Sequence, residues 1–402
     1  MSLIRGLLVF QLFIWNHFFA LANKSSNPDA QLTTPELIRK YGYPVEVHNV
    51  LTEDGYILEI HRIPYGRDKD KTNSKRQSIL VQHGLAGSSA DWVLMGTEKA
   101  LGYILADAGY DVWLGNNRGN IYSKNHTSLS AADRQFWDFS YHELGIYDLP
   151  ATIDYILDQT KHEKLFYVGH SQGTTQFWVT MSQRPDYNEK IGLMIGLAPV
   201  AFTGNIRGPI TKLAKFTYTF VRIGEMFGYP ELRPRSAWGM FISNIFCTNT
   251  TTTQFFCNHL LFLTTGFTHS ELSAENLTVI IGHVPAGASW KQSVHFGQGY
   301  INKDHFRQFD YDNKEKNNRL YNSSIPPEYE LNKITAPVAL FSSVDDFLAV
   351  PKDVERLKKK LANVVYHDEI SMKTFTHYDF VWGKSSVTLI FEPILKLLAF
   401  YK

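Results

Sequence analysis

The sequence predicts an α/β protein in which helices cover both faces of a mainly parallel sheet and one long segment interrupts the pattern. Short apolar strands alternate with helical stretches along the chain, which is typical of buried parallel sheets. The chain has 402 residues, of which 44% are hydrophobic and 14% aromatic. This composition can bury a large core, so it excludes a disordered or collagen-like chain.

The charge balance and the motif inventory exclude several classes of function. Forty Lys and Arg residues against 39 Asp and Glu give a net charge of +1, so no basic surplus exists to bind nucleic acid. Two cysteines are too few for a disulfide-dense scaffold or a multi-thiolate metal site. The sequence contains no H-E-x-x-H, P-loop or dinucleotide-binding motif. We therefore expect no metal and no cofactor, and no obligate protein partner is evident.

The N-terminus predicts export. Arg5 precedes an apolar run over residues 7–22 that ends in Ala20-Leu21-Ala22, the small-x-small pattern before a signal-peptidase cleavage site. A membrane anchor is the alternative, but the run is short and no basic cluster follows it. Besides Asn23-Lys24-Ser25, which adjoins the proposed cleavage site, four N-x-S/T sequons are consistent with glycosylation, at Asn125, Asn249, Asn276 and Asn322. We expect a glycoprotein of the secretory pathway, either secreted or lysosomal.

The first expected element is a hairpin. Its strands, over residues 45–51 and 56–63, show alternating residue patterns on either side of the turn Glu53-Asp54-Gly55. Six further runs are predicted as short buried strands: 79–82, 111–114, 165–169, 193–197, 337–341 and 364–367. Helices are expected at 98–108, 142–159, 174–184, 352–361 and 388–399.

The interruption, residues 202–325, is too long for a loop and is predicted to fold as a helical cap. It holds both cysteines and clusters of aromatic side chains. An independent second domain is the alternative, but the parent pattern continues on both sides. The predicted organisation is therefore a signal peptide at 1–22, a core at 23–201, the cap at 202–325 and the rest of the core at 326–402.

Gly169-His170-Ser171-Gln172-Gly173 carries the chemistry. It follows an apolar strand and opens a helical run, which is the context of a nucleophile elbow in an α/β-hydrolase fold. The strained turn exposes the hydroxyl of Ser171 at the end of the sheet, and the following helix directs free N–H groups toward it. Glycines on either side permit the close packing that such a turn requires.

A serine nucleophile needs a base, and the base needs an orienting acid, in the chain order Ser, Asp or Glu, His. His377 lies after the last predicted strand and before the last helix, where the base belongs, although it could also be a solvated loop histidine. Asp345 and Asp346 both follow the strand at 337–341, and spacing does not choose between them.

An oxyanion hole needs two backbone donors, one of which is the residue after the nucleophile, Gln172. The other should come from an early strand-to-helix loop. The segment 82–87, which contains His83-Gly84, is in the right place. Taken alone, the H-G dipeptide is more typical of an ordinary glycine-containing turn.

Together these motifs resemble the gastric and lysosomal acid lipases and their insect relatives. The resemblance runs from about Pro44 to the C-terminus. It rests on the segments E-D-G-Y-I-L at 53–58, Q-H-G-L at 82–85, G-N-N-R-G-N at 115–120, Y-D-L-P-A at 147–151, G-H-S-Q-G-T at 169–174 and H-Y-D-F at 377–380.

The resemblance implies Ser171 as nucleophile, His377 as base and the amides of Leu85 and Gln172 as the oxyanion hole. It also selects Asp346 as the acid, because the family's Asp-x-Leu-Ala-Asp-Pro segment aligns with 346–351. In this chain Val350 replaces the second aspartate of that segment. The resemblance further implies a lipid-covering cap. It also implies a disulfide that joins Cys247 to Cys257.

The expected activity is hydrolysis of carboxylic esters of neutral lipids, triacylglycerols first and sterol esters second, through an acyl-enzyme. The substrate would be met at an oil–water or membrane interface. Two alternatives stay open: a carboxylesterase for small esters, and a non-catalytic lipid-binding or storage protein on a lipase fold. The presence of Ser171, Asp346 and His377 together argues against the second, because such proteins lose the nucleophile.

Overall fold

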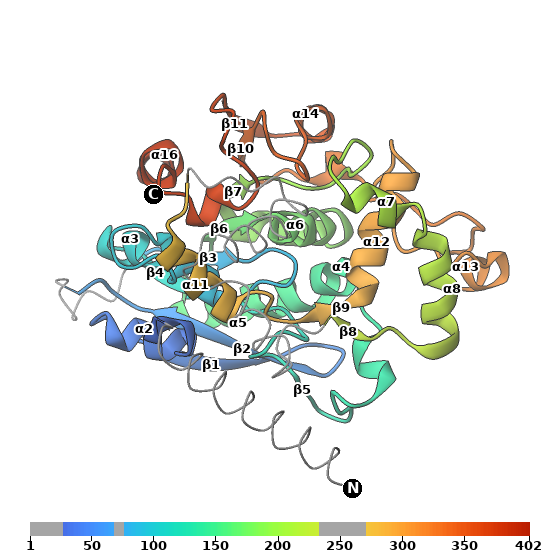
Figure 1. Ribbon diagram of the computed structural model, residues 1–402, viewed down its shortest axis with the longest axis horizontal. Coiled ribbons are helices and arrows are strands. Elements are labelled where there is room, and N and C mark those ends of the chain that lie inside the picture. Colours follow the sequence, from blue (N-terminus) through green and yellow to red (C-terminus); the bar gives the residue numbers. More distant parts are fainter. Residues whose placement is uncertain (1–26, 68–75, 233–270) are drawn as a thin grey trace, which may run out of the picture.

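The computed structural model describes residues 27–67, 76–232 and 271–402 (Figure 1). The predicted signal peptide, the predicted Cys247–Cys257 disulfide and the sequon at Asn249 lie outside the described residues. No helix within the described ranges is both long and apolar enough to cross a membrane.

A mixed sheet forms the centre of the described chain, with strand order β1-β2-β4-β3-β6-β7-β10-β11, and β5 pairs with β2. Its strands are β1 Glu46–Leu51, β2 Tyr56–Ile63, β3 Ser78–Gln82, β4 Asp111–Leu114, β5 Asn125–His126, β6 Leu165–His170, β7 Ile191–Leu197, β10 Val338–Ser343 and β11 Val364–Ile370. All neighbours from β4 to β11 pair in parallel, whereas β1, β2 and β5 pair antiparallel. Each strand predicted from the sequence begins within two residues of an observed strand, and the predicted mainly parallel sheet is confirmed.

Alternating strand residues fill two separate cores, one on each face of the sheet. On β3, for example, Ile79 and Val81 belong to one core and Leu80 to the other. The helices that cover the first face are α2 Thr34–Lys40, α3 Leu101–Asp107, α15 Asp379–Trp382 and α16 Glu392–Tyr401. The second face is covered by α5 Leu149–Thr160, α6 Gln172–Gln183 and α14 Pro351–Lys360. Because both faces are covered, the central strands β3, β4, β6, β7 and β10 are buried almost throughout and read as mainly apolar runs.

The helix expected over 142–159 is continuous but not uniformly α-helical. It consists of α4 Tyr141–Glu143, a π-helical segment η4 Leu144–Asp148 and then α5. Gly145 lies in the π segment, and a methyl group there would sit 2.5 Å from the side chain of Val179 on α6. The Gly145 carbonyl accepts a hydrogen bond from Thr180 Oγ1 at 2.6 Å. The π-helical turn therefore coincides with close contact between this helix and α6.

Within 202–325, the described chain contains the helices α7 Ile210–Ala214, α8 Thr217–Phe227, α11 Ala274–His283, α12 Trp290–Ile301 and α13 Lys314–Tyr321. A short sheet pairs β8 Glu231–Leu232 with β9 Ala288–Ser289. Helices α7, α8, α12 and α13 lie together at one end of the molecule, at the right of Figure 1. Helix α11 instead packs on the core, where a methyl group at Gly282 would meet the carbonyl of Ala30 at 2.3 Å.

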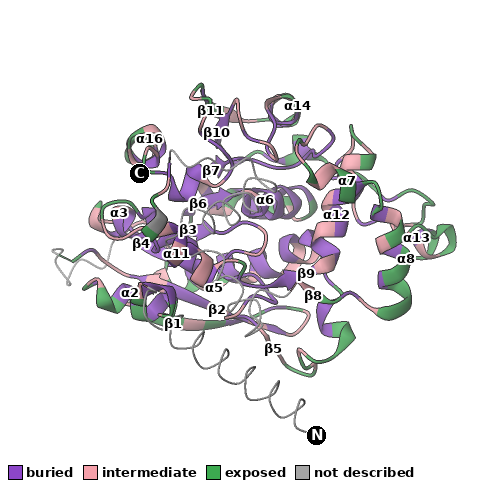
Figure 2. Ribbon diagram, in the orientation of Figure 1, coloured by how far each residue is buried: buried purple, intermediate pink, exposed green. Residues whose placement is uncertain are grey.

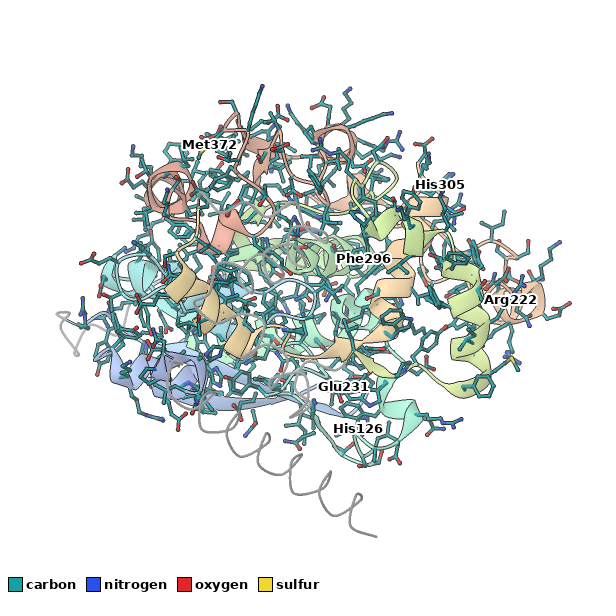
Figure 3. The ribbon with its side chains drawn as sticks, in the orientation of Figure 1. His126, Arg222, Glu231, Phe296, His305 and Met372 are labelled. Carbon is teal, nitrogen blue, oxygen red and sulfur yellow. The ribbon has the colours of Figure 1, made fainter. Side chains whose placement is uncertain are left out.

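Helix α12 joins this group of helices to the core. Lys291 is 1% exposed and its Nζ lies 2.7 Å from the Asp138 carboxylate. The ring of His295 stacks on Tyr141 with centroids 3.7 Å apart, and His295 also bonds to Ser140 Oγ at 3.0 Å. Phe296, labelled on α12 in Figure 3, packs against the ring of Tyr141 as well. The domain boundaries at 202 and 325 stay a prediction.

Candidate active site

Ser171 lies in the sharp turn between β6 and α6. Its backbone has φ 51° and ψ −116°, a region that costs a non-glycine residue about 1–3 kcal/mol and occurs mainly at functional sites. The turn is held by the Ser171 amide, which donates to the Leu197 carbonyl at 3.0 Å, and by its carbonyl, which accepts from the Thr174 amide at 2.8 Å. The surrounding structure therefore fixes Ser171 in this strained conformation.

The glycines of the motif permit this turn to pack closely. A methyl group at Gly169 would lie 2.8 Å from the backbone of Gly173. One at Gly173 would lie 2.4 Å from the carbonyl oxygen of Gln82, on the neighbouring strand β3. No side chain fits at either position, which brings the start of α6 directly against β3.

His377 reaches Ser171 from the loop between β11 and α15. Its Nε2 lies 2.8 Å from Ser171 Oγ, and its side chain is buried, at 2% exposure. Two bonds hold the loop: Thr376 donates its amide and its hydroxyl to Asp379, at 2.6 and 2.8 Å. The His377 carbonyl accepts a hydrogen bond from His170 Nε2 at 2.9 Å, which ties this loop to the end of β6.

Asp346, and not Asp345, faces the histidine. The Asp346 carboxylate oxygens lie 2.9 and 3.1 Å from His377 Nδ1, whereas Asp345 is half-buried and its amide bonds to Ser343 Oγ. The amides of Leu348 and Ala349 also donate to Asp346 Oδ1, at 2.8 and 2.9 Å. Sequence spacing left this choice open and the family resemblance selected Asp346, which is the carboxylate that the loop geometry brings to His377.

Electrostatics keep Asp346 ionised although it is fully buried. Burial alone would raise its pKa, but the electrostatic interaction and hydrogen bond with His377 and the bonds from the two backbone amides outweigh burial and lower the pKa. A carboxylate can only accept, so His377 Nδ1 carries the proton and Nε2 is left to accept the proton of Ser171 Oγ. The geometry is that of a nucleophile, a base and an orienting acid.

The predicted oxyanion-hole loop also abuts Ser171. A methyl group at Gly84 would lie 3.2 Å from Ser171 Cβ, so the loop after β3 passes directly beside Ser171. Among the described residues, neither the Leu85 amide nor the Gln172 amide has a hydrogen-bond acceptor. Within the described part of the chain, both N–H groups are therefore free to donate to an anion beside Ser171.

A buried ion cluster next to the site was not anticipated from the sequence. The guanidinium of Arg118, 1% exposed, donates to Asp54 at 2.5 and 2.7 Å and through Nε to Asp148 at 2.7 Å. It also lies 3.8 Å from the ring centroid of Tyr56. All four residues belong to the motifs that carry the family resemblance. Charged residues within otherwise apolar segments are the sequence signal that could have predicted the cluster.

The sequons at Asn125, Asn276 and Asn322 lie within the described residues and differ in exposure. Asn125 and Asn322 are exposed. Asn276 is partly buried in the first turn of α11, and its backbone amide donates the capping hydrogen bond to Ser273 Oγ at 3.2 Å. Glycosylation at these three positions stays a prediction.

Comparisons with known proteins agree with the fold. A family model described as a partial alpha/beta-hydrolase lipase region matches residues 34–96, and one described as alpha/beta hydrolase fold matches residues 77–212. Among solved structures, a putative lipase from Acinetobacter baumannii superposes with a TM-score of 0.52 at 14% identity, over 92% of this chain and 96% of that one. A soluble variant of yeast monoglyceride lipase gives a TM-score of 0.51 at 15% identity, over 90% and 99%.

Curated relatives are more similar and span nearly the whole chain. Gastric triacylglycerol lipase from Bos taurus is 38% identical, over 96% of this chain and 95% of its own length. Human lysosomal acid lipase/cholesteryl ester hydrolase is 36% identical, over 94% and 93%. Lipase 1 from Drosophila melanogaster is 40% identical, over 94% and 82%. The chain therefore belongs to the family of gastric and lysosomal acid lipases, on the α/β-hydrolase fold.

Proposed function

We propose that this protein is a lipase that hydrolyses the carboxylic ester bonds of neutral lipids, triacylglycerols and also sterol esters. The observation that carries the proposal is the continuous hydrogen-bonded chain from Ser171 Oγ through His377 to Asp346, with bonds of 2.8 and 2.9 Å. The substrate class follows the relatives, which are named for triacylglycerol and cholesteryl ester hydrolysis. A non-catalytic lipid-binding protein would have no need of this arrangement.

In the proposed reaction, Ser171 Oγ attacks the ester carbonyl while His377 Nε2 takes its proton. The tetrahedral oxyanion is bound by the amides of Leu85 and Gln172, and Asp346 stabilises the imidazolium. His377 then gives the proton to the leaving alcohol, which leaves an acyl group on Ser171. Water, deprotonated by the same histidine, attacks the acyl-enzyme, and the histidine returns this proton to Ser171 Oγ as the fatty acid is released.

The proposed site of contact with lipid is the outer face of α8. Phe216, Ile223 and Phe227 recur at helical spacing and are 58%, 48% and 58% exposed, and Met226 is 71% exposed. Arg222, labelled at the outer edge of Figure 3, lies among them and pairs with Asp312 at 2.6 Å. An apolar face of this kind is stable in contact with an oil–water or membrane interface.

Export is part of the same proposal. The relatives carry the words gastric and lysosomal in their names, and the N-terminal sequence predicts a signal peptide. We place this protein in the secretory pathway, either secreted or in the lysosome.

The test is a substrate panel with the purified protein: emulsified triolein, cholesteryl oleate and short p-nitrophenyl esters, from acid to neutral pH. We expect hydrolysis of triolein and cholesteryl oleate that rises once the ester exceeds its solubility limit. Activity on the short soluble esters alone would favour the carboxylesterase alternative. Binding of lipid without hydrolysis, equal in the wild type and in Ser171→Ala, would favour the lipid-carrier alternative.

A further inference from the structure

We infer that His83 is a positioning residue that sets the orientation of the oxyanion-hole amide of Leu85, an inference that rests on the proposed function. His83 lies at the end of β3, two residues before Leu85, and only 2% of it is exposed. It does not belong to the Ser171–His377–Asp346 chain, and its ring makes two directed hydrogen bonds to backbone atoms.

The first bond fixes a peptide unit. His83 Nδ1 lies 2.7 Å from the carbonyl oxygen of Gly84. That carbonyl and the N–H of Leu85 belong to the same planar trans peptide, so they point in opposite directions. A donor that holds the Gly84 oxygen on one side therefore holds the Leu85 N–H on the other. A rotation of this peptide would turn the N–H away from the developing oxyanion.

The second bond fixes the tautomer of the ring. The backbone amide of Asn117 donates to His83 Nε2 at 3.1 Å, and the Asn120 side chain approaches the same atom at 3.4 Å. A backbone N–H can only donate, so Nε2 carries a lone pair and the proton of the neutral ring is on Nδ1. The ring is thereby a donor toward Gly84, which is the role that the carbonyl needs.

The donor to Nε2 is itself held rigidly. Gln82 Nε2 donates to Asn117 Oδ1 at 2.9 Å. The next residue, Arg118, bonds to Asp148 through its amide at 3.1 Å and through Nε at 2.7 Å. The buried ion cluster thus has a place in the site: it fixes the loop after β4, which fixes the ring of His83.

The rest of the oxyanion-hole loop is consistent with this role. The Gly84 oxygen also accepts from the Gly87 amide at 3.2 Å, and the Ala86 carbonyl accepts from the Ala286 amide at 2.6 Å. Burial lowers the pKa of His83 to about 4, so the ring stays neutral at pH 5. The neighbouring titratable groups are His170, which faces Gly84, and Asp91, which faces Gly87.

Two substitutions separate the two bonds of the ring. In His83→Asn the amide nitrogen occupies the δ position and can still donate to the Gly84 oxygen, but nothing reaches the Asn117 amide. In His83→Gln the amide oxygen reaches the ε position and can accept from Asn117, but the donor to Gly84 is lost. We expect kcat to fall about a hundredfold in His83→Gln, as for the loss of one oxyanion donor. His83→Asn should stay within about fivefold of wild type, with KM unchanged in both.

An inhibitor that mimics the tetrahedral intermediate distinguishes a positioning role for His83 from a purely structural one, which would leave its inhibition constant unchanged. A long-chain alkyl boronic acid binds through the oxyanion hole, so its inhibition constant should rise in His83→Gln by the same factor as kcat falls. Equal losses in the two variants, or a loss only in His83→Asn, would overturn the inference. An inactive wild-type protein would instead refute the proposed function.

A measurement on the wild-type protein covers the case in which the variants do not fold. In protein labelled with ¹⁵N-histidine, long-range ¹H–¹⁵N correlation spectra distinguish an Nδ1–H ring from an Nε2–H ring. We expect the Nδ1–H tautomer for His83 from pH 7 down to pH 5, assigned by its loss in either variant or by sequential assignment. An Nε2–H ring, or a ring protonated on both nitrogens in this range, would refute the inference.

Discussion

Helices α6 and α8 are 12 and 11 residues long, and their compositions give the wrong impression of their surroundings. Helix α6 contains three threonines, three glutamines and a serine, yet every residue from Gln172 to Ser182 is buried. Helix α8 is rich in aromatic and aliphatic side chains, yet its buried residues are Thr217, Val221 and Gly224. Figure 2 shows the contrast between the purple α6 and the largely green α8.

Hydrogen bonds explain how the three threonines of α6 tolerate burial. Thr174 Oγ1 donates to the Ser171 carbonyl at 2.6 Å, and Thr175 Oγ1 donates to the Val200 carbonyl at 2.8 Å. Thr180 Oγ1 reaches both the Gly145 and the Gln176 carbonyls. A buried hydroxyl is inexpensive once it is bonded, and these bonds tie α6 to the Ser171 turn, to the segment after β7 and to η4. Buried polarity marks the rigid catalytic region, and exposed apolarity marks the surface proposed to meet lipid.

The largest effect should come from the head of α6. Ser171→Ala removes the nucleophile of a coupled triad, for which we expect a loss on the order of a millionfold in kcat. The fold should be unaffected, since the strained turn is held by backbone bonds. Ester hydrolysis and circular dichroism of the purified variant check both statements. Substantial residual turnover would move the nucleophile away from the elbow.

The next largest effect should separate two adjacent carboxylates. Asp346→Asn favours the wrong tautomer of His377, which costs about ten-thousandfold in kcat in a serine protease. Asp345→Asn is the matched control and should change kcat only severalfold, because Asp345 does not face the histidine. Steady-state kinetics of the two variants decide the matter. The opposite ranking would transfer the role of acid to Asp345.

Acid stability should depend on the buried imidazole that precedes Ser171. Burial, reinforced by the charge of His377, lowers the pKa of His170 to about 3, whereas an unfolded histidine has a pKa of about 6.5. Below about pH 6.5 the unfolded chain binds a proton that the folded chain does not, so stability falls as pH falls. At pH 4.5 this loss is about 3 kcal/mol, at about 1.4 kcal/mol per pH unit.

His170→Gln removes this titration and can retain the donor to the His377 carbonyl. The free energy of unfolding, measured with denaturant at pH 7 and pH 4.5, should decrease less in His170→Gln than in wild type, by about 3 kcal/mol. Identical acid losses in the two proteins would show that His170 titrates normally.

The proposed lipid-facing surface should produce a smaller and selective effect. The double substitution of Met226 and Phe227 by serine should lower turnover of emulsified triolein about tenfold, because apolar area that would leave water at the interface is lost. Turnover of a soluble short ester should not change. Leu51→Ser on β1 removes a side chain that is 61% exposed and is the matched control. A control with the same loss would mean that α8 has no special part in interfacial binding.

The smallest expected effect is a difference in the free energy of unfolding between matched substitutions in α6 and α8. Thr180→Val on α6 leaves the Gly145 carbonyl without its threonine donor and should destabilise the fold by about 1 kcal/mol. Thr219→Val, at an exposed position of α8, should change the free energy of unfolding by less than about 0.5 kcal/mol. Urea titrations of both variants provide the measurement. Equal values would mean that the buried hydroxyl bonds of α6 contribute nothing to stability.

By itself the sequence determined the sheet and the turn that bears Ser171. The strands are short apolar runs whose period does not depend on distant residues, and the G-x-S-x-G turn is a local conformation with local steric requirements. Once the strands are located, the loops that follow them are located too, so the sequence also predicted the positions of His377 and of the loop with Asp345 and Asp346. Helix α2 was missed, although Thr33 and Glu36 form a capping box at its start that the sequence already signals.

Only the tertiary structure decided that α6 is buried and that Arg118 joins Asp54 and Asp148. It also showed Asp346 facing His377, a choice that residue spacing left open and only the family resemblance had made. Each of these depends on residues far apart in the chain, whose approach no local pattern encodes. Asp346 and His377 are 31 positions apart, and Arg118 and Asp54 are 64 apart. The tertiary neighbours of a loop side chain determine where it points. They also supply the hydrogen-bond partners without which burying a polar group would be costly.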